Sequence, residues 1–169
     1  SSTKALRELT EQYGGSYYPS AVGEVNVVEK MKEVKAVIGG EGNGGVIFPE
    51  LHYGRDALVG IALFLSHLAQ SGITCSKLRQ RYPFYHMKKN KIQLTPGIDV
   101  DNILKQLKNN YKDYPVNDVD GVRIEFPEGW VHLRKSNTEP IIRVYSEGED
   151  KDATEKLASK IMDSVKRML

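Results

Sequence analysis

Three consecutive segments in the second half of the chain have the pattern of β-strands, and they most constrain the fold. Val122, Ile124 and Phe126 alternate with polar residues, which is the period of a half-buried strand. A turn is predicted at 127–129, a second strand at 130–134 and a third at 141–145. Residues 91–94 have strand character, and apolar helical stripes cover 100–107 and 157–168. The pattern predicts an antiparallel sheet with helices on one face.

The first half instead alternates helices with short apolar strands, which is typical of an α/β fold. Helices are predicted from a cap at Ser1 or Ser2, over 25–34, and from Asp56 to about Gln70, where Gly72 ends the last one. Residues 36–38 and 46–48 are the predicted strands. A length of 169 residues allows one domain or two. We therefore predict an α/β domain over 1–80 and an α+β domain with an antiparallel sheet over 81–169, with the boundary near 80–83.

Composition narrows the possible partners. The chain has 24 Lys and Arg against 22 Asp and Glu, a formal net charge of +2, which gives no electrostatic case for a nucleic acid or a membrane surface. One cysteine, Cys75, excludes an intramolecular disulfide framework and fits a reducing, cytoplasmic setting. No apolar run approaches the roughly 20 residues of a membrane span. Because the chain starts at Ser1 without Met and enters a helix at once, we expect a piece of a longer protein.

The segment 134–143 is the strongest candidate for chemistry. Arg134 and Arg143 stand at the ends of two predicted strands, and the loop between them carries hydroxyl and amide side chains at Ser136, Asn137 and Thr138. Guanidinium groups pair with phosphate in a bidentate way, and hydroxyls and loop N–H groups bind the remaining oxygens. The alternative is a polar hairpin turn in which these side chains bond their own backbone. The pattern leaves the two interpretations nearly equal.

The glycine-rich loop 39–45 is the second candidate. It presents the carboxylate of Glu41 and the amide of Asn43 between residues that let a ligand approach the backbone closely. A carboxylate beside an amide suits sugar hydroxyls, which need acceptors and donors together. The loop is no dinucleotide fingerprint, because no helix opens there. A tight hairpin between Ile38 and Val46 is the alternative, and glycine content alone favours it.

Other polar residues give weaker signals. Asp118 and Asp120 resemble a paired-carboxylate metal loop, but Gly121 and a clear strand follow at once, so a turn is the better interpretation and no metal site is assigned. The four histidines have no ligand spacing to one another or to Cys75. His52, near the glycine loop, is the one weak candidate for proton transfer.

Taken together, these motifs resemble the C-terminal half of the α-D-phosphohexomutases. The segment 134–143 looks like the phosphate-binding loop of that family's fourth domain, and 40–45 looks like the sugar-binding loop of its third domain. The run 22–31 and the helix start at 54–56 fit further third-domain landmarks. The resemblance covers essentially the whole chain. It implies a partial α/β third domain followed by a complete α+β fourth domain.

In this family an active-site phosphoserine exchanges its phosphoryl group with a hexose phosphate through a bisphosphate intermediate that turns over in the cleft. The resemblance implies that this chain binds the hexose phosphate substrate, with the sugar held by residues of the glycine-rich loop and the phosphate by residues of the segment 134–143. The phosphoserine and the Mg²⁺ site would lie in missing N-terminal domains of the same chain, so no catalytic or metal-binding residue is expected here and the fragment alone should be inactive. The substrate-binding set is Glu41, Asn43, Gly44, Arg134, Ser136, Asn137, Thr138 and Arg143.

The resemblance favours phosphoglucosamine mutase, with phosphomannomutase/phosphoglucomutase and a non-catalytic phosphosugar-binding module as alternatives. Two departures bear on the sugar loop. Several family members have Ser where this chain has Asn43, and some have His where Gly45 stands. The general acid or base is therefore unassigned.

Overall fold

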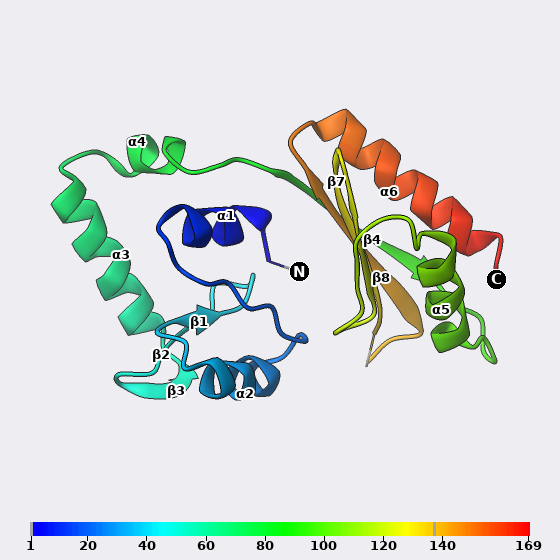
Figure 1. Ribbon diagram of the computed structural model, residues 1–169, viewed down its shortest axis with the longest axis horizontal. Helices are drawn as coiled ribbons and strands as arrows, with labels where there is room; N and C mark the ends of the chain where they lie inside the picture. The colour runs from blue at the N-terminus through cyan, green and yellow to red at the C-terminus, as the bar shows by residue number, and fades with distance from the viewer. Residues whose placement is uncertain (1, 137) are drawn as a thin grey trace. The chain divides into compact units, whose positions relative to one another are not determined.

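The computed structural model describes residues 2–136 and 138–169, and the chain divides into two compact units, 1–84 and 85–169 (Figure 1). Each unit has its own antiparallel sheet. The first unit contains α1 (Lys4–Gln12), α2 (Glu24–Val34), β1 (Gly39–Gly40), β2 (Val46–Phe48), β3 (His52–Arg55), α3 (Ala57–Ser71) and α4 (Cys75–Gln80). The second contains β4 (His86–Gln93), α5 (Val100–Asn110), β5 (Val116–Asn117), β6 (Val122–Phe126), β7 (Gly129–Lys135), β8 (Ile141–Gly148) and α6 (Lys151–Lys166).

The first unit is built on a small three-stranded sheet in the order β1-β2-β3. Gly39 pairs with Ile47, and Phe48 pairs with His52. Helix α2 packs on this sheet through Val27 and Met31, which form a buried cluster with Ile47. A side chain at Gly39 would place its Cβ 2.2 Å from the Met31 sulfur, so the glycine permits this close packing.

Helix α3 follows the sequence prediction closely at both ends. The Asp56 side chain caps its start by accepting from the Val59 N–H at 3.0 Å, and Gly72, with φ 64°, ends it in the left-handed conformation. Its apolar surface, however, is uncovered by the described residues: the helix buries none of its side chains, and Leu58 is 78% exposed.

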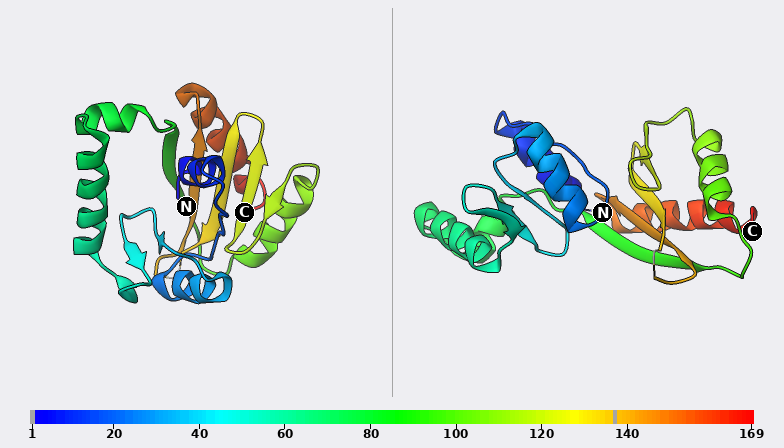
Figure 2. Two further views of the ribbon diagram at one scale, coloured as in Figure 1. Left: turned by 60° about the vertical axis from the view of Figure 1, so that its left-hand side comes forward. Right: turned by 90° about the horizontal axis from the view of Figure 1, so that it is seen from below.

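The second unit has a five-stranded sheet in the order β4-β8-β7-β6-β5. The left view of Figure 2 shows its strands running side by side, and α5 and α6 lie on the same side of the sheet in Figure 1. The buried core joins one face of the sheet to these helices, and it includes Val131 and Leu133 of β7, Leu107 of α5 and Ile161 of α6. Because side chains alternate along a strand, Trp130, His132 and Arg134 belong to the opposite face.

Several sequence predictions hold and several are wrong. The strands at 122–126, 130–134 and 141–145 and the helices of the second unit are confirmed, and helices cover one face of its sheet. The cap of the first helix is Thr3, which accepts from the Ala5 N–H at 3.3 Å, not a residue before it. Residues 36–38 do not form the predicted strand: the ladder begins at Gly39, and Val37 is 77% exposed. No helix among the described residues is long and apolar enough to cross a bilayer.

Candidate functional site

The strand register of the second unit brings the two arginines together. Arg134 of β7 is the direct antiparallel partner of Arg143 of β8. Cα atoms of such partners lie about 4.5–5.5 Å apart, with both side chains on the same face of the sheet. The predicted pair is therefore a local cluster of positive charge at one end of two adjacent strands, where the loop between them begins and ends.

Residues of the intervening loop hold Arg143 in place. Its Nη2 donates to the Glu139 carboxylate at 2.8 Å and to the Ser136 Oγ at 3.4 Å. Ser136 is buried, and its backbone N–H donates to the Ile141 carbonyl at 3.1 Å, which fixes the position of the residue that accepts from Arg143. Thr138 is exposed. Asn137, also predicted to bind phosphate, lies outside the described residues.

Arg134 is held differently. The residue is half-buried, and its Nε is buried without a hydrogen-bond acceptor among the described residues. Leaving a buried charged donor without an acceptor is costly, by about 1–3 kcal/mol or more. Of the two arginines, only Arg143 forms an ion pair with a described carboxylate, that of Glu139. The pair thus carries more positive charge than its surroundings neutralise.

The glycine-rich loop forms the hairpin turn between β1 and β2. The Gly44 N–H donates to the Glu41 carbonyl and the Glu41 N–H to the Gly45 carbonyl, both at 3.1 Å. The Asn43 Oδ1 accepts from the Gly45 N–H at 3.0 Å, and Gly44 has φ 89°. A Cβ at Gly40 would lie 2.2 Å from the Gly45 carbonyl oxygen, so the hairpin requires glycine there. The loop is thus a hairpin turn, and it presents Asn43 at an exposed position; sugar binding by this turn stays a prediction.

Glu41 is fixed by a contact distant in sequence. Its Oε1 accepts from the Gly23 N–H at 3.2 Å, at the position preceding α2. Nearby, Glu24 at the start of α2 accepts from the Arg55 Nε at 2.8 Å and forms an ion pair with it. The segments 22–24, 41–45 and 54–56 are thereby tied into one structure. Sequence reasoning singled out each of these segments but not the bonds that join them.

His52 is engaged through both ring nitrogens. Its Nδ1 accepts from the Gly54 N–H at 3.0 Å, so its Nε2 carries the proton shared with the Asp56 carboxylate at 3.1 Å. The backbone hydrogen bond from Val59 lowers the pKa of Asp56, and the bond with His52 adds to this effect. The imidazole thus supports the turn before α3, and this geometry gives it no free nitrogen for proton transfer.

The paired aspartates at 118 and 120 form a turn before β6. Lys108 pairs with the Asp118 carboxylate, and this hydrogen bond lowers the pKa of Asp118. Gly121 has φ 75°, the left-handed conformation that such a turn requires. Within residues 2–136 and 138–169, no three His, Cys, Asp or Glu side chains gather in a way that could hold a metal ion.

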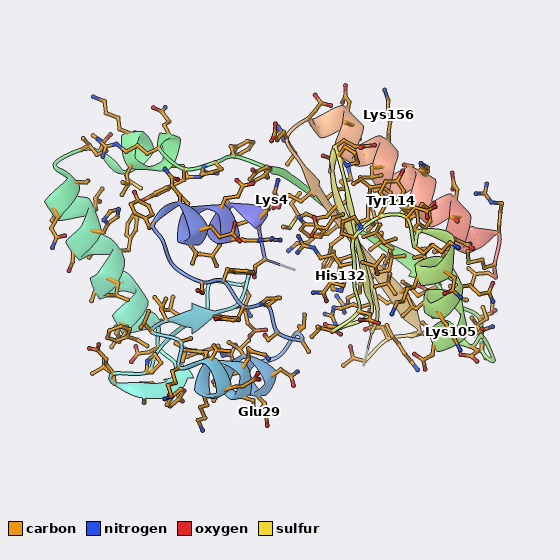
Figure 3. All side chains as sticks on the ribbon, viewed as in Figure 1. Lys4, Glu29, Lys105, Tyr114, His132 and Lys156 are labelled. Carbon is orange, nitrogen blue, oxygen red and sulfur yellow. The ribbon has the colours of Figure 1, made fainter. Side chains whose placement is uncertain are left out.

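His132, labelled in Figure 3, anchors that turn to the sheet. It lies on β7 and is 6% exposed, and its Nε2 donates to the Asp120 carbonyl at 2.5 Å. Burial lowers the pKa of the imidazole, because desolvation disfavours its charged form. His132 is therefore neutral at pH 7.

The depressed pKa of His132 predicts that acid weakens the second unit. Below pH about 6.5 the His132 imidazole binds a proton in the unfolded chain, whereas in the folded chain it stays neutral to lower pH. The free energy of unfolding therefore falls by up to about 1.4 kcal/mol per pH unit until the pH reaches the pKa of His132 in the folded chain. Fluorescence of Trp130, the one tryptophan, should report this in urea titrations between pH 7 and pH 5. His132→Gln should flatten the dependence. His67→Gln is the matched control, because that imidazole is exposed, and an equal effect of both variants would contradict the assignment.

Comparison with known proteins identifies the family. The alpha/beta/alpha domain III of phosphoglucomutase/phosphomannomutase matches residues 1–85, and the C-terminal domain of the same family matches residues 90–164. The chain belongs to the phosphoglucomutase/phosphomannomutase family. The resemblance inferred from the two loops is thereby confirmed. A crystal structure of a family protein from Burkholderia thailandensis matches with a TM-score of 0.80 and 25% identity, over 98% of this chain and 35% of that one.

Curated family members give the same result. The chain is 33% identical over 163 residues to a phosphoglucosamine/phosphogalactosamine mutase of Sulfurisphaera tokodaii, which covers 95% of this chain and 36% of the relative. It is 34% identical over 149 residues to a phosphoglucomutase/phosphomannomutase of Thermococcus kodakarensis, over 87% of this chain and 32% of the relative. The chain thus spans about a third of the length of these relatives, and it corresponds to their C-terminal domains.

Proposed function

We propose that this chain supplies the sugar- and phosphate-binding loops of a phosphohexomutase, which interconverts a hexose 6-phosphate and a hexose 1-phosphate. The observation that carries the proposal is the register pairing of Arg134 with Arg143, supported by the buried Ser136. Two guanidinium groups side by side can donate paired hydrogen bonds to the oxygens of a phosphate monoester. Such a clamp holds the phosphate that does not react while the other end of the sugar exchanges its phosphoryl group.

The hairpin 39–45 supplies the sugar contacts in this proposal. The Gly23 N–H fixes the Glu41 carboxylate, which retains further acceptor capacity for sugar hydroxyls. Asn43 uses its Oδ1 within the turn, so its amide NH₂ can donate to a hydroxyl. Gly44 lets the sugar approach the backbone. Acceptors and donors side by side suit a ring that binds in two orientations, as a bisphosphate intermediate must.

The remaining chemistry is assigned to other parts of the protein. We place the phosphoserine and its Mg²⁺ site in domains outside this chain, because the chain corresponds only to the C-terminal domains of its relatives. The uncovered apolar side chains of α3 support the idea that the third domain is partial here. The chain alone is then inactive, and the complete protein is a cytoplasmic phosphoprotein. Among substrates we favour glucosamine phosphate, which agrees with relatives named phosphoglucosamine mutase, over mannose or glucose phosphate.

Binding by the chain itself tests the proposal directly. Isothermal titration calorimetry should detect glucosamine 6-phosphate and mannose 6-phosphate with a dissociation constant of about 1 mM, since a few charge-assisted contacts supply roughly 4 kcal/mol. Glucosamine and mannose, which lack the phosphate, should bind at least tenfold more weakly, because the clamp recognises phosphate. Equal affinity for sugar and sugar phosphate, or no binding of either, would contradict the phosphate clamp.

Activity of the complete protein separates the mutase from its alternatives. Assays with glucosamine 6-phosphate and mannose 6-phosphate side by side should show conversion to the corresponding 1-phosphate, and glucosamine 6-phosphate should be converted faster. A complete protein that binds these compounds and converts neither would be the stand-alone phosphosugar-binding module. Faster conversion of mannose 6-phosphate would assign phosphomannomutase activity instead.

A further inference from the structure

A third cation lies in the same row of the sheet as the arginine pair. Lys91 of β4 is the antiparallel partner of Arg143, which is in turn the partner of Arg134. Partners in adjacent strands project from the same face, so Lys91, Arg143 and Arg134 form a continuous row across β4, β8 and β7. Like charges directly opposite one another destabilise a sheet. A row of three cations is therefore an arrangement that folding alone does not favour.

The other lysines of β4 have partners within the second unit. Lys88, on the opposite face, forms an ion pair with Glu155 of α6 at 3.0 Å. Lys89 lies over the Tyr145 ring, with its Nζ 5.6 Å from the ring centroid. Lys91 is exposed and makes no ion pair with any residue in the described part of the chain. Its ammonium is thus available to a ligand.

The charge of the row points to a dianion. Lys91, Arg143 and Arg134 contribute three positive charges, and the Glu139 carboxylate, paired with Arg143, contributes one negative charge. The row and its paired carboxylate thus carry two net positive charges, equal in magnitude to the charge of a phosphate monoester above its second pKa of about 6. A monoanionic group would leave one positive charge of the row uncompensated.

We propose that Lys91 is a third phosphate-binding residue, which together with Arg134 and Arg143 makes the site selective for a dianionic sugar phosphate. The inference rests on the proposed function and deepens it. The two guanidinium groups bind the phosphate oxygens through directed hydrogen bonds, and the ammonium of Lys91 adds a mobile point charge from the neighbouring strand. Lys91 therefore contributes more to charge selectivity than to geometry.

The test compares two glucose esters on the 169-residue chain at pH 7.5: glucose 6-phosphate, a dianion, and glucose 6-sulfate, a monoanion. Lys91→Met should weaken binding of the phosphate ester about fivefold to tenfold and of the sulfate ester about twofold to threefold, because the lost attraction scales with ligand charge. Lys91→Arg, which keeps the charge, should bind the phosphate ester within about twofold of the natural chain. Lys88→Met is the matched control: it removes a lysine three residues away on the other face and should change neither affinity.

Each outcome decides between the two proposals. If Lys91→Met binds the phosphate ester as well as the natural chain, or weakens both esters equally, Lys91 is not a selective phosphate ligand. If Lys91→Met has no effect but Arg143→Ala abolishes binding, the proposed function stands and only the role of Lys91 is overturned. If neither variant changes the affinity, the phosphate clamp itself is wrong. Trp130 emission and circular dichroism confirm that each variant is folded.

Discussion

If the complete protein is the phosphohexomutase proposed above, replacing Arg143 by alanine should lower its kcat/KM for hexose phosphate roughly 100-fold. The guanidinium contributes charge-assisted hydrogen bonds to a dianion, each stronger than a neutral one, and losing them costs about 2–3 kcal/mol. Because the phosphate is bound in both the ground state and the transition state, KM should rise, and turnover should fall as the sugar loses its fixed position. Steady-state kinetics over a wide range of substrate concentrations measure both effects.

Arg143→Lys provides a graded control for this prediction. Lysine keeps the positive charge but lacks the planar guanidinium. We therefore expect the kcat/KM of Arg143→Lys to be about tenfold higher than that of Arg143→Ala, but still below that of the natural protein. Folding should be little affected, because the Arg143 side chain is only half-buried and its ion pair with the exposed Glu139 contributes at most about 1 kcal/mol. If Arg143→Ala leaves KM and turnover unchanged while the protein stays folded, the phosphate-clamp assignment fails.

The predictability of the second unit depended on where each strand lies in the sheet. Strands β6, β7 and β8 are interior, so their apolar residues alternate clearly and the sequence pattern predicts them. Strand β4 lies at the edge, where lysines are tolerated on both faces. Its first half, 86–90, therefore lacks the alternating pattern, and only its last residues were predicted. Because Lys91 became significant only through its pairing with Arg143, no sequence pattern could have assigned it.

In the first unit, the hydrophobic pattern predicts a strand at 36–38 that does not form and gives no sign of the strand at 52–55. Val37 and Ile38 are apolar and β-branched, yet they are exposed, and the ladder starts at Gly39. Glycines form that strand because the hairpin backbone and Met31 approach too closely for a side chain. Strand β3, His52–Arg55, has no apolar alternation, and only its pairing with β2 reveals it. Tertiary contacts decide such short strands more than propensity does.

The chemical identity of the candidate residues was accessible from the sequence, but their arrangement was not. A loop bracketed by Arg134 and Arg143 is visible in the sequence, whereas their direct opposition depends on the register of β7 and β8. Likewise, the carboxylate of Glu41 was predicted as a ligand, but its bond to the Gly23 N–H requires α2 and the hairpin to meet. Glu139, which partly neutralises Arg143, was missed because its side chain could equally have pointed to solvent.

Gly121→Ala should destabilise the second unit by about 3–5 kcal/mol, a large part of the stability of a domain this size. Gly121 has φ 75°, which costs any residue with a Cβ about 1–2 kcal/mol. The added Cβ would also lie 2.2 Å from the Leu133 carbonyl oxygen and 2.9 Å from the Arg134 Cα. Both are backbone atoms of β7, so the turn 118–121 must move away from the strand. Urea unfolding followed by Trp130 fluorescence measures the loss.

The same substitution should reach the phosphate site, because the displaced turn adjoins Arg134. In the absence of urea, where the Gly121→Ala variant is still folded, its affinity for glucose 6-phosphate should be severalfold lower than that of the natural chain. Gly97→Ala is the control that measures the cost of a positive φ alone, because Gly97 has φ 93° but nothing lies within 4 Å of an added Cβ. This substitution should lower the free energy of unfolding by only about 1–2 kcal/mol and leave the affinity unchanged. If the two variants lose equal stability, the close contact with β7 contributes nothing, and the turn does not constrain Arg134. A larger loss at Gly121 accompanied by weaker binding would instead show that the turn 118–121 holds the strand end from which the clamp is built.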